Sequence, residues 1–291
     1  DKFLYALRDA TATVESIPLI AASIMSKKLA EGIDGLVLDV KTGNGAFLER
    51  IEDSRILART MIEIGRGLGK KVVAVISSME QPLGLTVGNA VEVAECLDCL
   101  RGHGPDDLLT LSLELAAEMV LLGGKAESIE EARRICRRTI DDGSALEKFA
   151  RLIEVQGGDP RVIDEPQRFP VARARVEIKA GRPGFVASLK ARPIGHATML
   201  LGAGRSRVDS SIDPAVGVIL AKKVGDEIRE GETLCTMLVN DQTKLAEARD
   251  LIEGAFTIAE SPPERAPLIV ERIGLEQEPA CFDQASGGHR S

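Results

Sequence analysis

The residues whose types and spacing best suit chemistry lie near the start of the chain. Ser23 and Lys27 are four positions apart in a predicted helix, so their side chains share one face about one turn apart. Arg8 lies in a preceding predicted helix, three residues after Tyr5, the only tyrosine. A guanidinium fork, an ammonium and a hydroxyl together suit the carbonyl and N–H edge of a uracil-like ring. The spacing alone fits ordinary solvated helix charges equally well, since Lys28 follows directly.

Two predicted helices in the first ~30 residues must position these groups. The second helix is expected over residues 17–31. Ser16 is placed to cap its N-terminus, Pro18 lies in the first turn, where a missing N–H costs nothing, and Gly32 follows its end. If the two helices pack as a hairpin, the polar side chains converge on one small ligand.

A strand, helix and strand follow, which predicts a βαβ unit with a parallel sheet. Residues 35–41 and 71–77 are short, branched apolar runs, typical of strands buried on both faces. Residues 53–68 between them have the period of an amphipathic helix. Helical patterns continue from about residue 89 to 155, with breaks near residues 103, 123 and 142.

The pattern changes near residue 157, where alternating segments punctuated by Gly and Pro begin. Residues 223–234 predict two short strands joined by a charged turn, as in lipoyl-like and hammerhead β-domains. The expected fold class is therefore α/β, with the remnant of a small helical lobe, a parallel-sheet core flanked by helices, and a C-terminal α+β domain. The expected boundaries are 1–32, 33–167 and 168–275, followed by a disordered tail over 276–291.

Composition narrows the possible functions. The chain has 291 residues and a formal net charge of −8, which argues against a nucleic-acid binder. No run approaches the ~20 apolar residues of a membrane span, and the start shows neither a signal pattern nor an initiator Met. We therefore expect a cytoplasmic protein without membrane contact, and a truncated chain is one interpretation of this start. The five scattered cysteines indicate reduced thiols.

Two short motifs invite a functional interpretation that their surroundings do not support. Cys96 and Cys99 form a CxxC, but without a second CxxC or a nearby pair of histidines they are interpreted as buried helix cysteines. Residues 43–45, Gly-Asn-Gly, follow a strand but match neither the Walker nor the dinucleotide pattern, so a tight turn is expected. The histidines, at positions 103, 196 and 289, are not placed as a general base.

Four blocks of sequence, in order along nearly the whole chain, closely resemble the thymidine and pyrimidine nucleoside phosphorylases. The first, residues 5–27, runs from Tyr-Ala-Leu-Arg-Asp-Ala to Ser-Ile-Met-Ser-Lys, and the second, residues 37–47, is Val-Leu-Asp-Val-Lys-Thr-Gly-Asn-Gly-Ala-Phe. The third is residues 81–90, Gln-Pro-Leu-Gly-Leu-Thr-Val-Gly-Asn-Ala. The fourth combines residues 202–205 with 213–217.

The resemblance implies roles for the polar residues near the start. Arg8, Ser23 and Lys27 would contact a pyrimidine base, with Arg8 and Lys27 catalytic and Tyr5 packed beside the base. The family uses inorganic phosphate, and no organic cofactor, to cleave a pyrimidine nucleoside into base and sugar 1-phosphate. Negative charge develops on the base as the bond breaks, so fixed cations there stabilise the transition state. A homodimer is expected when the family's early helical lobe is present.

The family also holds a monovalent cation, potassium in at least some members. The matching positions are the carbonyls of Leu83 and Thr86 and the carboxylate of Glu95. Without the resemblance, Glu95 would be interpreted as an ordinary acid on a helix surface.

The family's phosphate-binding loop has no counterpart here. The sequence is therefore expected to be a fragment, a chain completed by a second polypeptide, or a truncated homologue that serves as a non-catalytic interaction protein. A nucleoside-monophosphate phosphorylase of the AMP type is the other enzyme considered. The choice between uridine and thymidine is left open.

Overall fold

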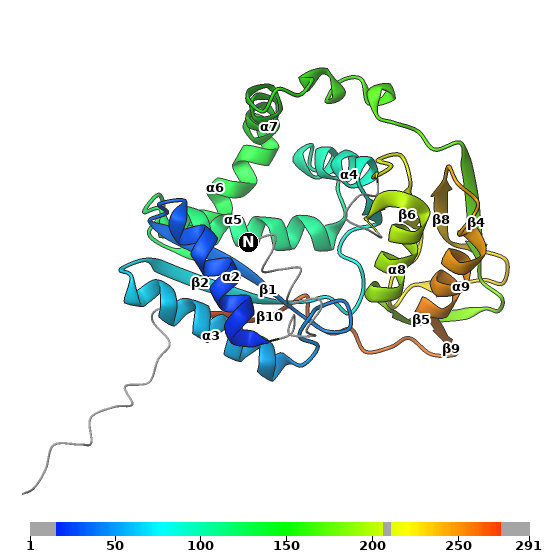
Figure 1. Ribbon diagram of the computed structural model, residues 1–291, viewed down its shortest axis with the longest axis horizontal. Coiled ribbons are helices and arrows are strands. Elements are labelled where there is room, and N and C mark those ends of the chain that lie inside the picture. The colour runs from blue at the N-terminus through cyan, green and yellow to red at the C-terminus, as the bar shows by residue number, and fades with distance from the viewer. Residues whose placement is uncertain (1–15, 206–210, 275–291) are drawn as a thin grey trace, which may run out of the picture.

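The computed structural model describes residues 16–205 and 211–274, which form helices around three small sheets (Figure 1). The fold is mixed α/β, as the sequence predicted. Among the described residues, no helix combines the length and apolar character needed to cross a membrane.

The first sheet is built on two parallel strands, β1 (Gly35–Thr42) and β2 (Lys71–Ser78). They are connected by α3 (Ile51–Gly67), which confirms the predicted βαβ unit. In the described sheet β2 is central and six of its eight residues are buried, as its apolar run requires. In contrast, β1 is an edge strand with exposed positions, so the prediction that both its faces are buried was wrong.

Helices cover both faces of this sheet. One face packs against α2 (Ile17–Ala30) and α3, and their shared apolar core includes Met25, Leu38 and Met61. The other face lies against α5 (Asp106–Leu122). Helix α2 matches its predicted span to one residue and Gly32 follows it at φ 73°, but the Ser16 side chain makes no capping bond, contrary to expectation.

The third strand, β10 (Ile269–Ile273), comes from the far end of the chain and pairs antiparallel with β2. Its neighbouring side chains point to opposite faces. Glu271 binds Arg55 of α3 at 2.5 Å, and Arg272 binds Glu118 of α5 at 2.6 Å. The strand lies inside residues 168–275, the range predicted for a separate domain, yet it completes the first sheet. Strand periodicity identifies a strand but not its partner.

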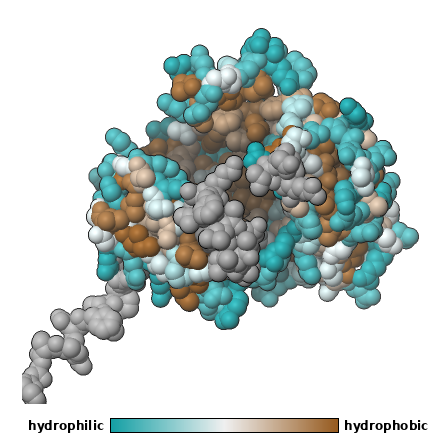
Figure 2. Space-filling view, viewed as in Figure 1, coloured by the Kyte–Doolittle hydropathy of each residue, from teal (hydrophilic) through white to brown (hydrophobic). Residues whose placement is uncertain are grey.

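Four helices follow the first sheet, broken where the sequence predicted. They are α4 (Ala90–Leu100), α5, α6 (Ile129–Asp141) and α7 (Ser144–Val155). Two short 3-10 turns then follow, Pro160–Val162 and Pro166–Arg168. Helix α7 and the two turns arch over α4 (Figure 1). Apolar side chains gather in the hollow beneath them, where Val93 of α4 and Phe149 of α7 line a space of about 650 Å³ (Figure 2).

The remaining strands form two further sheets around a second core. The order in the four-stranded sheet is β3 (Thr86–Gly88), β6 (Gly217–Leu220), β8 (Thr233–Val239) and β4 (Ala174–Lys179). The order in the other is β7 (Glu227–Ile228), β5 (Gly184–Leu189) and β9 (Phe256–Ala259). Helix α8 (Ala191–Thr198), its π-helical extension Met199–Ala203, and α9 (Leu245–Ala255) pack on them.

Candidate functional site

The described part of the predicted base-binding group lies on one face of α2. Lys27 Nζ donates to Ser23 Oγ at 3.3 Å, so the two side chains do meet across one helical turn. Lys27 is exposed and Ser23 half-buried, whereas Ala21 and Met25 face the core. The two groups are thus presented together at the surface. Arg8 and Tyr5 lie outside the described residues.

A second polar cluster lies on the first sheet, near the carboxyl ends of β1 and β2. Lys41 Nζ of β1 donates to Asp39 Oδ2 at 2.6 Å and to Ser77 Oγ of β2 at 2.9 Å. The Ser77 hydroxyl donates in turn to Asp39 Oδ1 at 2.5 Å. In open α/β sheets, ligands bind outside the carboxyl ends of parallel strands. The cluster therefore stands where such sheets place chemistry.

The backbone amides of the Gly-Asn-Gly loop after β1 donate to acceptors inside the protein. Each of the four amides from residue 43 to 46 finds an internal acceptor: Gly43 to Glu49 O at 3.0 Å, Asn44 to Glu80 Oε2 at 3.4 Å, Gly45 to Met79 O at 3.0 Å, and Ala46 to Gly43 O at 2.9 Å. A phosphate cradle needs such amides directed at the ligand. The loop is therefore a packing turn, as predicted.

The same loop joins the first sheet to the C-terminal sheets. Asn44 Oδ1 accepts from the amide of Ala191 at 2.8 Å, at the start of α8, whose own N-cap residue, Lys190, supplies no side-chain bond. Asn44 thus caps a helix of the other sheet system. Gly45 allows this approach, because a Cβ there would lie 2.8 Å from Ala191 Cβ and 2.9 Å from Met79 O.

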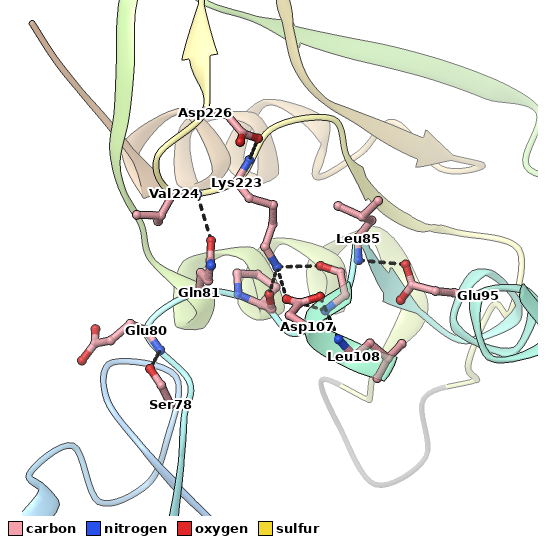
Figure 3. A network of polar contacts seen from close by, with 12 residues as sticks. Ser78, Glu80, Gln81, Leu85, Glu95, Asp107, Leu108, Lys223, Val224 and Asp226 are labelled. Atoms are coloured by element: carbon pink, nitrogen blue, oxygen red, sulfur yellow. Dashed lines mark hydrogen bonds and ion pairs between the residues drawn. The ribbon is translucent and has the colours of Figure 1, made fainter. Parts of the chain in front are cut away.

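The loop after β2 is organised in the opposite way, around carbonyl oxygens. Lys223, between β6 and β7, directs its ammonium at the carbonyl of Pro82, at the carbonyl of Gly84 (2.7 Å), and at Asp107 Oδ2 (2.9 Å) (Figure 3). Its side chain is only 15% exposed. Asp107 also accepts from the amide of Gly84 at 3.3 Å. One cation and one carboxylate thus fix the backbone on this side.

Glu95 of α4 lies on the other side of that loop. It is 7% exposed and accepts from the amide of Leu85 at 2.8 Å. Burial raises the pKa of its carboxyl, and the bond from Leu85 only partly opposes this. Thr86 lies close enough to help hold the charge, but no hydrogen bond of good geometry satisfies its buried Oγ1. The pair lines a hollow of about 580 Å³.

The strand register leaves the backbone of Thr86 facing away from its partner strand. Leu220 of β6 donates to the carbonyl of Leu85 at 2.7 Å, so in this antiparallel ladder the next pair, Thr86 and Ile219, is not hydrogen-bonded. Since β3 is an edge strand, the Thr86 carbonyl points to the free edge. Within the described residues, no group donates to the Leu83 carbonyl.

These groups fit a monovalent cation better than a transition metal. In the described ranges, no three His, Cys, Asp or Glu side chains form a metal cluster. Carbonyl, hydroxyl and carboxylate oxygens are hard ligands suited to a hard cation. The buried negative charge of Glu95 and the unsatisfied Thr86 hydroxyl are what such an ion would neutralise and bind.

Comparison with known proteins identifies the family of the chain. Residues 1–146 match the glycosyl transferase family a/b domain, and residues 185–259 match the pyrimidine nucleoside phosphorylase C-terminal domain. The chain belongs to the thymidine and pyrimidine nucleoside phosphorylase family.

Curated relatives in this phosphorylase family are identical to the chain at about half of the aligned positions. Pyrimidine-nucleoside phosphorylases of Staphylococcus aureus strains RF122 and USA300 are each 50% identical to it over 276 residues, and that of strain MSSA476 is 49% identical. Each alignment covers 95% of this chain and 63% of the relative. The chain thus spans under two thirds of the length of these phosphorylases.

Two groups of this phosphorylase homologue escaped the sequence analysis. Asp39 and Lys41 had a signal, because they are the charged members of an otherwise apolar strand and alternate onto one face. Lys223 had none. Its partners are more than a hundred positions away, and the neighbouring Lys222 is indistinguishable from it in sequence.

Proposed function

We propose that the protein acts in phosphorolysis of a pyrimidine nucleoside or deoxynucleoside, giving free base and sugar 1-phosphate. The observation that carries the proposal is the 50% identity, across 95% of the chain, to proteins named pyrimidine-nucleoside phosphorylase. Pyrimidine nucleoside and inorganic phosphate are then its substrates, without an organic cofactor.

In this reaction Ser23 and Lys27 of α2 bind the pyrimidine edge together with Arg8, and Tyr5 packs beside it. As the glycosidic bond lengthens, the sugar gains positive charge and the base oxygens gain negative charge. The Lys27 ammonium, held beside Ser23 at 3.3 Å, supports this proposal because it is a fixed positive charge next to a hydroxyl. Such a charge favours the transition state over the neutral ground state.

The test is release of uracil from uridine, or thymine from thymidine, in the presence and absence of phosphate. It is run with the chain alone and with the chain joined to the unmatched part of a Staphylococcus relative. AMP and CMP serve as competing substrates. Release that requires phosphate and favours the nucleosides supports the proposal, whereas no release in either form, or preference for the monophosphates, contradicts it.

The role of α2 is tested by Lys27→Met against Lys28→Met. Lys28 is the matched control, because it is the next residue of the same helix and pairs with Glu31 at 3.1 Å on the surface. Lys27→Met should lower kcat/KM about 100-fold or more, as for other groups that meet transition-state charge. Equal activity of the two variants would exclude Lys27 from the base site.

A potassium ion at Leu83, Thr86 and Glu95 is part of the same proposal. The Thr86 carbonyl and hydroxyl, the Leu83 carbonyl and the Glu95 carboxylate would hold it. When bound, it supplies a positive charge that neutralises the buried carboxylate and fixes the loop. A homodimer and a cytoplasmic location are further expectations, tested by sedimentation of the purified protein and by cell fractionation.

A further inference from the structure

The ammonium of Lys223 is itself bound like a small monovalent cation. An ammonium has three donors, and all three are matched by two backbone carbonyls and one carboxylate. The side chain reaches this position from the C-terminal sheets. Its backbone is fixed too, since the amide of Lys223 donates to Asp226 at 2.8 Å and that of Val224 to Gln81 at 3.0 Å.

Residues 82–86 therefore separate two oppositely charged groups (Figure 3). Lys223 takes the carbonyls of Pro82 and Gly84 on one side. Glu95 takes the amide of Leu85 on the other. Gly84 has a φ of 71°, and a Cβ at this position would collide with Glu95 Oε2, so the carboxylate presses directly against the loop.

We propose that Lys223 is the positioning residue of the cation site: by binding the carbonyls of Pro82 and Gly84, its ammonium holds residues 82–86 so that the remaining oxygens serve the ion. The inference rests on the proposed potassium site. Because two carbonyls are occupied by Lys223, those of Leu83 and Thr86 are left for the ion beside Glu95. Loss of Lys223 should release the loop and weaken potassium binding without removing any ligand.

The experiment follows potassium binding through thermal stability, without substrate. The protein is exchanged into choline chloride and titrated with KCl at constant ionic strength, and Tm is measured by circular dichroism. For the wild type, Tm should rise with KCl and saturate. Glu95→Gln should abolish the rise. Lys223→Met should move the midpoint to at least tenfold higher KCl.

Lys222→Met is the matched control for loss of a lysine charge in the same loop. Lys222 binds Glu232 at 2.6 Å, away from residues 82–86. Its KCl midpoint should equal that of the wild type. An unchanged midpoint in Lys223→Met, or an equal shift in both variants, would overturn the inference. No potassium effect in the wild type would overturn it together with the cation site, while the phosphorolysis assay would be unaffected.

Two further variants test the proposal even if Lys223→Met does not fold. Lys223→Arg keeps the charge, but a flat guanidinium cannot place three donors as a compact ammonium does, so its midpoint should also rise. Lys223→Ala leaves space for propylammonium, which replaces the deleted atoms. Added propylammonium should return the midpoint of Lys223→Ala toward the wild-type value and leave Lys222→Ala unchanged. Failure of this rescue would contradict a positioning role for the ammonium.

Discussion

The loops that follow the two parallel strands use their backbone polar groups in opposite ways. After β1, the amides of residues 43–46 all donate to internal oxygens, and Asn44 reaches across to cap α8. After β2, backbone oxygens remain, with Lys223 on one side and Glu95 on the other. Residues 43–46 of the first loop form a joint and leave no backbone amide for a ligand, whereas the second loop offers acceptors. A glycine loop after a strand is thus not evidence for anion binding until its amides are accounted for.

The largest expected change in the free energy of unfolding follows a substitution in the first loop. Gly45→Ala puts a Cβ 2.8 Å from Met79 Cγ and 2.9 Å from Met79 O, where backbone must move. We expect the free energy of unfolding to fall by about 3 kcal/mol, the upper range for overpacking. Urea unfolding measures it, with Gly195→Ala, which has open space, as control. The potassium midpoint should not change, because Lys223 and Glu95, and not Gly45, contact residues 82–86, and a change would break the comparison.

Gly84→Ala, unlike Gly45→Ala, should change the response to potassium. The residue has a φ of 71°, and its new Cβ would meet the Glu95 carboxylate. Strain in the left-handed region should cost about 2 kcal/mol, and displacement of the carboxylate should remove the rise of Tm with KCl. The same titration and urea unfolding measure both effects. Gly69→Ala, with a φ of 70° and no neighbour within 4 Å, isolates the strain. Equal potassium responses in the two variants would show that the second loop is only structural.

A smaller effect is expected for Asn44→Ala. The change removes the cap of α8 and the bond from Asn44 Nδ2 to Glu80 Oε2 at 2.7 Å. The loss should be about 1 kcal/mol, as for other helix caps. Gln242→Ala, at an exposed position, is the control in the same urea experiment. A loss no larger than that of the control would show that Asn44 does not join the two sheet systems.

The local features of the fold were predictable, and its long-range pairings were not. Apolar runs identified β1 and β2, and breaks near residues 103, 123 and 142 separated the helices, because these patterns depend on neighbours in sequence. The pairing of β10 with β2 and the bond from Lys223 to Gly84 join positions far apart, and no periodicity specifies them. Ser16 lies at the N-cap with the extended backbone usual there, but its hydroxyl makes no capping bond, and Pro18 in the first turn has no N–H to offer it.

The candidate site likewise combines local features, which the sequence predicts, with long-range ones, which it does not. The contact between Ser23 and Lys27 follows from helical spacing. The environment of Glu95 does not, since a surface acid and a buried one look alike in sequence. The family resemblance chose Glu95, and the structure buries it; burial raises the pKa of its carboxyl, an opposing effect that a bound cation would offset. Whether an ion binds there stays a prediction.

The smallest expected effect concerns a thiol near the second loop. Cys99 lies on α4, one turn from Glu95. Burial raises its pKa to about 11, and the Glu95 charge adds to the shift. At pH 8 only about one thiol in a thousand is then ionised, so the native thiol should resist disulfide reagents. Residue-specific labelling followed by mass spectrometry measures the rate.

Reactivity of Cys99 should rise as pH approaches 11, since the thiolate is the reactive form. Urea-unfolded protein, in which the pKa returns to its usual value, is the control and should react at pH 8. Glu95→Gln should accelerate the native reaction slightly, because it removes the smaller, electrostatic part of the shift and leaves the burial. If Glu95→Gln leaves the rate unchanged, the carboxylate is not charged in the native protein at pH 8, and the second loop loses the negative group that distinguishes it from the first.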